Sequence, residues 1–147
     1  MEATEINQQA PVVSRKEIVT RAPLDAVWAA HTDIPDWPTW NPAITRAELE
    51  GPLKVGAYFH WETEGLAISS TISEVIPGRR IVWSGTVNGI LGIHQWTFTP
   101  ISDGVLIHTE ESWEGVPVEE RATELQMALD SSLEAWLEHL KRYVERE

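Results

Sequence analysis

Two side chains in this sequence, one imidazole and one carboxylate, could transfer a proton on the apolar face of a predicted sheet. His94 and Glu111 lie in two segments where apolar and polar residues alternate, which is typical of half-buried strands. A carboxylate next to an imidazole in such a wall can act as a general acid or base, or anchor a ligand through a hydrogen bond. The structural alternative is a histidine that fills the core and a carboxylate that reaches water or caps a helix.

Three turn signals predict how the strands that carry these residues pair. Asn88-Gly89, Pro77-Gly78 and Glu64-Gly65 each indicate a two-residue turn, and a turn fixes which residues face each other. His94 is then opposite Trp83. The face that results is dominated by large apolar side chains and comprises Phe59, Trp61, Ile68, Ser70, Ile72, Trp83, Gly85, His94, Trp96 and Phe98.

The last strand is less tightly defined because the loop before it, residues 100–104, is longer. Apolar content favours an inner set of Val105, Ile107, Thr109, Glu111 and Trp113. A slip of the loop would exchange the faces and place Glu110 inside instead of Glu111, so both alternatives remain open. On the apolar face Glu74 is out of place, and a bulge near Val75-Ile76 would turn it outward.

The elements around this sheet follow from proline and periodicity signals. Residues 12–20 read as a first strand, residues 23–32 as a short helix, and the proline-rich stretch 33–42 as a short helical turn or ordered loop. A meander of strands runs from residue 43 to residue 113. Residues 117–145 carry apolar side chains at three- and four-residue spacing, which predicts one long amphipathic helix laid across the sheet.

Polar residues in the loop and in the helix add candidates for a pocket. Gln126 interrupts the apolar stripe of the long helix, so we expect it to face either a wet pocket or a backbone partner. Trp40 and Asn41 could close a pocket mouth, although Trp40 serves core packing equally well. The ligand-binding residues expected in total are Trp40, Asn41, Phe59, Trp61, Ser70, Ile72, Trp83, His94, Trp96, Phe98, Ile107, Thr109, Glu111, Gln126, Leu129 and Leu133.

Composition excludes several classes of function. The formal net charge of −12 would repel nucleic acid, and with no cysteine there is no disulfide or thiolate chemistry. No His/Asp/Glu cluster has metal-ligand spacing, so we expect neither a metal nor a cofactor. Residues 1–11 lack the apolar core of a signal peptide and are expected to form a flexible tail. No apolar segment is long enough to form a membrane-spanning helix. We expect a single domain over residues 12–147, in a cytoplasmic protein that is a monomer or a homodimer.

The order of elements, together with particular residues, resembles a known superfamily. The segment PLDAVWAAHTDIPDWPTWNP, the run from Val75 to Trp83 and the run from Glu110 to Gly115 are similar to the polyketide cyclase/dehydrase-like branch of the START and birch-pollen-allergen superfamily, often called SRPBCC. The resemblance implies an α+β helix-grip fold: a curved antiparallel sheet of about seven strands around a long C-terminal helix, with two short helices after the first strand. It also implies a hydrophobic cavity between sheet and helix, with Glu111 on the cavity side.

Three hypotheses for function follow. The first is a binding protein for an apolar or aromatic, lipid- or polyketide-like small molecule, in which aromatic rings supply contact area. The second is a cofactor-independent cyclase or dehydratase that uses Glu111 or His94 as general acid/base. The third is a protein-partner module like the co-chaperone relatives, which a large exposed apolar patch would favour.

Overall fold

All seven strands join one antiparallel sheet in the computed structural model, which describes residues 3–146. Across the sheet the strands follow the order β1-β7-β6-β5-β4-β3-β2, so every neighbouring pair except β1 and β7 is consecutive in the chain. Their bounds are β1 Val12–Thr20, β2 Ile44–Leu49, β3 Tyr58–Thr63, β4 Leu66–Ile76, β5 Arg80–Val87, β6 Ile90–Ile101 and β7 Gly104–Glu114.

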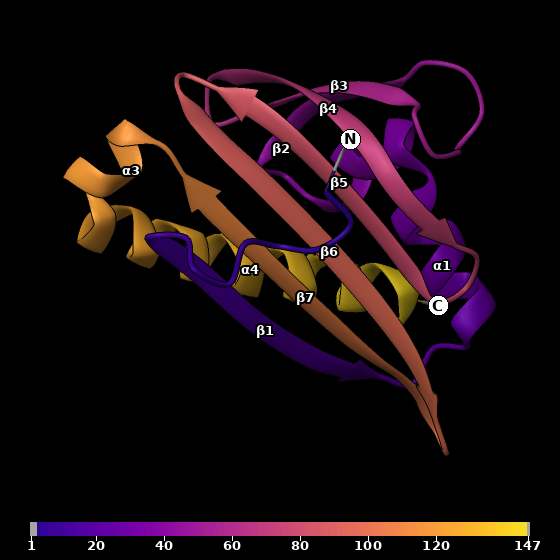
Figure 1. Ribbon diagram of the computed structural model, residues 1–147. Helices are drawn as coiled ribbons and strands as arrows, with labels where there is room; N and C mark the ends of the chain where they lie inside the picture. The colour runs from indigo at the N-terminus through magenta and orange to yellow at the C-terminus, as the bar shows by residue number, and fades with distance from the viewer. Residues whose placement is uncertain (1–2, 147) are drawn as a thin grey trace.

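The helices lie on one face of this sheet, with α4 running along it and α1 near the C-terminal end of α4 (Figure 1). This arrangement is the helix-grip fold, as the sequence predicted. The bounds are α1 Leu24–Thr32, the 3₁₀ turn η1 Ile34–Asp36, α2 Trp37–Trp40, α3 Val116–Glu120 and α4 Ala122–Val144.

The C-terminal helical segment is divided in two, which differs from the single helix predicted over residues 117–145. Arg121 separates α3 from α4 and has φ −131° and ψ 33°, outside the helical region. Its N–H still bonds the carbonyl of Val118, while its own carbonyl accepts the first bond of α4 from Leu125. The apolar periodicity continues through this break, which is why the sequence did not reveal it.

Pairing of the central strands matches the prediction at the positions that matter for the inner face. Trp83 is opposite His94, Ile72 is opposite Trp83, and Trp61 is opposite Ile68. At the Asn88-Gly89 turn both residues have positive φ, 51° and 81°, as a type I′ turn requires. The aromatic side chains of β3, β5 and β6 therefore share one face.

The β4–β5 turn departs from the prediction in two ways that compensate. Ile76 is opposite Arg80, so the turn is three residues long rather than two. The register then shifts between Ile72 and Glu74, which restores the expected partner of Ile72. The bulge therefore lies at Ser73 and not at residues 75–76. It turns Glu74 to the outer face, where its Oε1 lies 2.5 Å from Nε of Arg80.

Residues 3–11 lie against the outer face of the sheet, which corrects the expectation of a flexible tail. Ile6 is buried with Val82 and Ile93, two apolar residues that the strand pattern leaves on the outer face. The Ile6 N–H donates to the Gln95 side chain at 3.0 Å, and the Asn7 N–H donates to the Ser112 hydroxyl at 3.0 Å. The segment covers apolar surface that would otherwise face water, which is the physical reason for its placement. Residues 1 and 2 lie outside the described residues.

Replacing Ile6 by Ala tests this attachment. We expect the free energy of unfolding to fall by about 2 kcal/mol, because a buried branched side chain is lost from a small cluster. Urea unfolding measures the change. Val55→Ala is the control, since Val55 is 60% exposed and should change stability by less than about 0.5 kcal/mol. Equal, small effects of both substitutions would show that the segment is not attached in solution.

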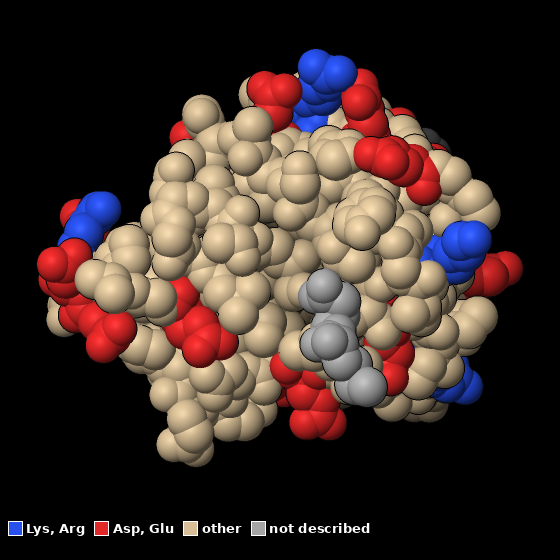
Figure 2. Space-filling model, turned by 45° about the horizontal axis from the view of Figure 1, so that its top comes forward, with Lys and Arg blue, Asp and Glu red and all other residues tan. Residues whose placement is uncertain are grey.

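Charged side chains are dispersed on the face that Figure 2 presents. Lys and Arg appear there singly, most of them next to acidic groups near the margin, and the centre of the face is uncharged. This face therefore offers no continuous basic surface to a polyanion.

Candidate functional site

Glu111 and His94 meet on the inner face, where β6 and β7 pair. The two residues are directly opposite each other, so Glu111 faces inward and Glu110 faces outward toward Arg15. Oε1 of Glu111 lies 3.2 Å from Nδ1 of His94. Oε2 of Glu111 accepts a hydrogen bond of 2.8 Å from Nε1 of Trp113, two residues along the same strand. The structure thus resolves the alternatives for the last strand in favour of Glu111.

Thr109 fixes which nitrogen of His94 carries the proton. The Thr109 hydroxyl donates its single hydrogen to the Gln95 carbonyl at 3.1 Å. It can therefore only accept at its other contact, the 2.8 Å bond with Nε2 of His94, so Nε2 carries a hydrogen. Nδ1 of a neutral His94 is then an acceptor that faces Glu111, and the carboxyl must supply the proton between them.

Burial favours the neutral form of both members of this pair. Desolvation raises the pKa of Glu111 to about 7, against a smaller opposing effect of the Trp113 hydrogen bond. Burial, together with the nearby His31, lowers the pKa of His94 well below its usual value. The imidazolium charge that would stabilise the Glu111 carboxylate is therefore absent. Near neutral pH, a carboxyl that exists in both its protonated and its ionised form therefore lies against a neutral imidazole.

Glycine at position 92 leaves room beside Glu111 for the Trp113 ring. Gly85 and Gly92 are opposite each other on β5 and β6. A Cβ on Gly92 would lie 3.4 Å from the Trp113 ring and 3.6 Å from Oε2 of Glu111. A larger residue there would press on the side chains that hold the carboxyl in place. The side chain of Glu111 is 16% exposed and that of His94 is 2% exposed, so Glu111 is the member of the pair closer to solvent.

Aromatic rings fill the interior that was expected to contain an open cavity. Trp136 of α4 lies at the centre of this cluster, with ring centroids 5.2 Å from Trp37 and 5.5 Å from Trp96. The Trp83 and His94 rings are 4.9 Å apart. Side chains from α2 and α4 thus occupy the space between sheet and helix. Periodicity does not specify how much of that space their rings take. A ligand that enters deeply has to displace a ring.

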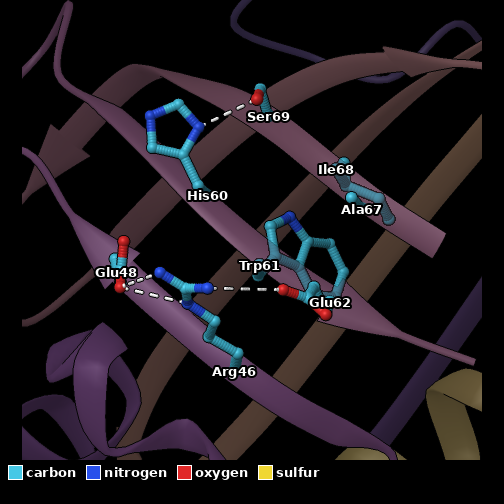
Figure 3. A pocket seen from close by; sticks show the side chains of 8 residues that line it. All are labelled: Arg46, Glu48, His60, Trp61, Glu62, Ala67, Ile68 and Ser69. Atoms are coloured by element: carbon cyan, nitrogen blue, oxygen red, sulfur yellow. Dashed lines mark hydrogen bonds and ion pairs between the residues drawn. The ribbon is translucent and has the colours of Figure 1, made fainter. Parts of the chain in front are cut away.

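A surface hollow lies over β2, β3 and β4 and is lined mainly by outer-face side chains (Figure 3). It has a volume of about 290 Å³. Arg46 spans it between Glu48 and Glu62, and Nδ1 of His60 is 2.8 Å from the Ser69 hydroxyl. These polar groups pair with one another, so the hollow is a surface feature with satisfied charges.

The polar candidates outside the Glu111 pair have partners within the protein. Gln126 donates to the Val13 carbonyl at 2.9 Å and so holds the edge strand β1, which is the backbone partner considered as an alternative to a wet pocket. The Asn41 side chain accepts a bond from the Ala43 N–H at 3.1 Å. The Ser70 hydroxyl accepts one of 3.2 Å from Nε1 of Trp61.

The remaining candidates are apolar and buried in one cluster that fills the interior. Trp40 packs against Trp136 and Tyr143, with ring centroids 5.8 Å and 6.3 Å away. The same core contains seven more of the expected ligand-binding residues: Phe59, Ile72, Trp96, Phe98, Ile107, Leu129 and Leu133.

His31 is the residue of this interior that the sequence analysis missed. It is fully buried on α1, and neither of its ring nitrogens has a hydrogen-bond partner. Its ring lies 4.4 Å from the Trp96 ring and 5.3 Å from Phe98. The available signal was its spacing four residues after Val27, which places both on the buried side of the short helix.

Comparison with known proteins places the chain in a family. A family profile described as polyketide cyclase / dehydrase and lipid transport matches residues 11–145, and the chain belongs to this family. A search of curated proteins found no match.

Solved structures share the fold at low sequence identity. A hypothetical protein, jhp0584 from Helicobacter pylori, superposes with a TM-score of 0.84 at 20% identity over 99% of both chains. A START superfamily protein from Mycobacterium smegmatis gives 0.78 at 16% identity over 90% of this chain and 97% of the other. The di-domain ARO/CYC StfQ from the steffimycin biosynthetic pathway gives 0.79 at 18% identity over 91% of this chain, which spans about half (51%) of StfQ.

Two further observations concern the described residues as a whole. None of the helices within residues 3–146 has both the length and the apolar character needed to cross a membrane. In the same part of the chain, no group of three or more His, Asp or Glu side chains is arranged to hold a metal ion.

Proposed function

We propose that this protein binds an apolar, aromatic small molecule against the inner face of its sheet, with Glu111 as the polar anchor. The observation that carries the proposal is the buried Glu111–His94 pair in an otherwise aromatic wall. Burying a carboxyl costs stability compared with an apolar residue of similar size, so packing alone does not account for it. Family membership and the START-like fold support a role in ligand binding or cyclisation.

Glu111 is also where a ligand can make first contact. Its side chain keeps 16% of its surface exposed, whereas His94 behind it is closed to solvent. Trp113, which holds the carboxyl, is only partly buried and offers an aromatic surface beside it. The carboxyl gives its one proton to Nδ1 of His94, so its oxygens can accept a hydrogen bond from a ligand hydroxyl without the desolvation cost of a full charge.

Glu111→Gln tests the anchor because it keeps the shape of the side chain and removes the acidic proton. We expect the affinity for 2-naphthol, measured by tryptophan fluorescence quenching, to fall about tenfold or more, the usual cost of about 1–3 kcal/mol for such a hydrogen bond. Glu110→Gln on the outer face is the matched control and should leave the affinity unchanged. Equal affinity in all three proteins would remove Glu111 from the site.

A second candidate function is acid–base catalysis by the same pair, favoured by the pKa of about 7 of Glu111. A general acid works best when its pKa is close to the working pH. Protonated Glu111 would give its proton to a departing hydroxyl of a ligand, as in a dehydration, and the carboxylate left behind, beside neutral His94, would take up a proton from the ligand carbon. In that case Glu111→Gln retains binding and lowers turnover by about a hundredfold or more.

The protein-partner role stays a prediction. The exposed large apolar side chains are distributed over several strands, loops and helices: Val19, Val55, Tyr58, Leu66, Ile76, Ile101, Val116 and Met127. Scattered exposure of this kind is common on protein surfaces and does not indicate a docking patch.

A further inference from the structure

The polar atoms of His31 make no hydrogen bond that stabilises the fold. The residue is fully buried near the end of α1, and both Nδ1 and Nε2 are without a hydrogen-bond partner. A phenylalanine or leucine would fill the same space without the cost of burying two polar atoms. Nε1 of Trp96 is also buried without a partner, and the two rings are 4.4 Å apart. Unpaired polar atoms therefore gather at one point of an aromatic interior.

The same two tryptophans connect His31 to the Glu111–His94 pair. Trp83 lies 5.9 Å from the His31 ring and 4.9 Å from the His94 ring. Trp96 lies 4.4 Å from His31 and 5.2 Å from His94. A flat aromatic molecule that packs on Trp83 and Trp96 would therefore come near both His31 and the Glu111–His94 pair.

We propose that His31 is a second polar contact of the interior ligand site, which takes a hydroxyl or carbonyl group at the inner end of an aromatic ligand. This inference rests on the proposed ligand-binding function and specifies its ligand class: an aromatic ring system with hydrogen-bonding groups at two separated positions. A neutral imidazole offers one donor and one acceptor, and Nε1 of Trp96 offers a second donor. Burial lowers the pKa of His31 to about 3, so it recognises neutral polar groups rather than anions.

Because rings fill the interior, the ligand has to displace one of them to reach His31. Trp136 and Trp37 are in the right position: the Trp136 ring lies 6.0 Å from His94 and 5.5 Å from Trp96, and the Trp37 ring lies 6.3 Å from His31. An incoming aromatic ring would replace the contacts that the indole gives up.

Three related probes test the proposal: naphthalene, 2-naphthol and 2,7-dihydroxynaphthalene, with affinity measured by calorimetry or tryptophan fluorescence. The wild-type protein should prefer the diol over 2-naphthol by about tenfold, the effect of one additional buried hydrogen bond. His31→Phe should abolish that preference and leave the affinity for naphthalene unchanged. His60→Phe on the outer face is the control and should behave as wild type.

The outcomes separate this inference from the function on which it rests. If the wild-type protein binds none of the probes, the proposed function fails and the inference with it. If His31→Phe retains the preference for the diol, His31 is not a contact, while the proposed ligand-binding function stands. If the variant does not fold, the ¹⁵N resonances of the His31 ring in the wild-type protein decide. A shift on addition of the diol that 2-naphthol does not cause supports the contact, and no shift overturns it.

Discussion

Replacing His31 by Phe should make the protein markedly more resistant to acid. Folded His31 accepts a proton only near pH 3, whereas the unfolded chain accepts one near pH 6.5. Stability is therefore lost as the pH falls through this window, by up to roughly 5 kcal/mol for the full difference. At pH 4 the wild-type protein should have lost about 3 kcal/mol more than His31→Phe, relative to pH 7.

Urea unfolding of both proteins at pH 7 and pH 4 measures this difference. Carboxylates and the other histidines titrate in both proteins, so their effects cancel in the comparison. His60→Phe provides the control, because His60 is exposed and its loss should leave the acid sensitivity in place. Parallel pH profiles for wild type and His31→Phe would mean that His31 is not buried and unpaired in solution.

Replacing Trp136 by Ala should cause the largest loss of stability at neutral pH. Its ring lies among those of Trp37, Trp96 and other aromatic residues, and only 5% of the residue is exposed. Truncating a large buried aromatic side chain costs about 3–5 kcal/mol, from lost burial and from the cavity that remains. Denaturant unfolding measures the loss.

Trp28→Ala is the matched control for this prediction, since Trp28 is only partly buried at the edge of the same core. We expect it to cost clearly less. Indole added to Trp136→Ala should raise its thermal midpoint, because a binder of the folded state shifts the equilibrium. A loss below about 1 kcal/mol for Trp136→Ala would indicate that the interior is open and not packed.

The inner face of the sheet could be predicted because turn chemistry and alternation act locally. Two short turns and the alternation of Trp83, His94 and Trp96 determine the face without knowledge of the helices. The pairing of Ile72 with Trp83 was correct although the turn was one residue longer, because the bulge at Ser73 compensated for it. A wrong turn length need not change the predicted face, since the apolar side chains of neighbouring strands must all lie on the buried side of the sheet.

What could not be predicted depends on contacts between distant segments. The partners of Gln126 and the docking of Ile6 require β1, α4 and the outer face to be in place. The packed interior likewise depends on how rings from α1, α2 and α4 meet, which periodicity does not specify. His31 escaped notice for the same reason: its spacing identifies a buried side of the helix but not the absence of partners.

The proton state of the Glu111 pair follows only from three-dimensional geometry. Sequence reasoning placed the carboxyl and the imidazole on one face but did not assign their protonation states. The hydroxyl of Thr109, which receives the Nε2–H of His94, and the burial of the imidazole leave His94 neutral. The result is a carboxyl whose pKa lies near 7.

The central claim, a ligand site at Glu111, is tested most directly by the indole N–H resonances of the protein during titration with 2-naphthol. The chain has 8 tryptophans, and only the Nε1–H of Trp113 reports the hydrogen bond to Glu111. We expect the Trp113 signal to shift strongly, the Trp28 signal to shift little, and the Trp113 response to disappear in Glu111→Gln. A Trp113 signal that does not move while 2-naphthol binds, or that moves equally in Glu111→Gln, would contradict the claim.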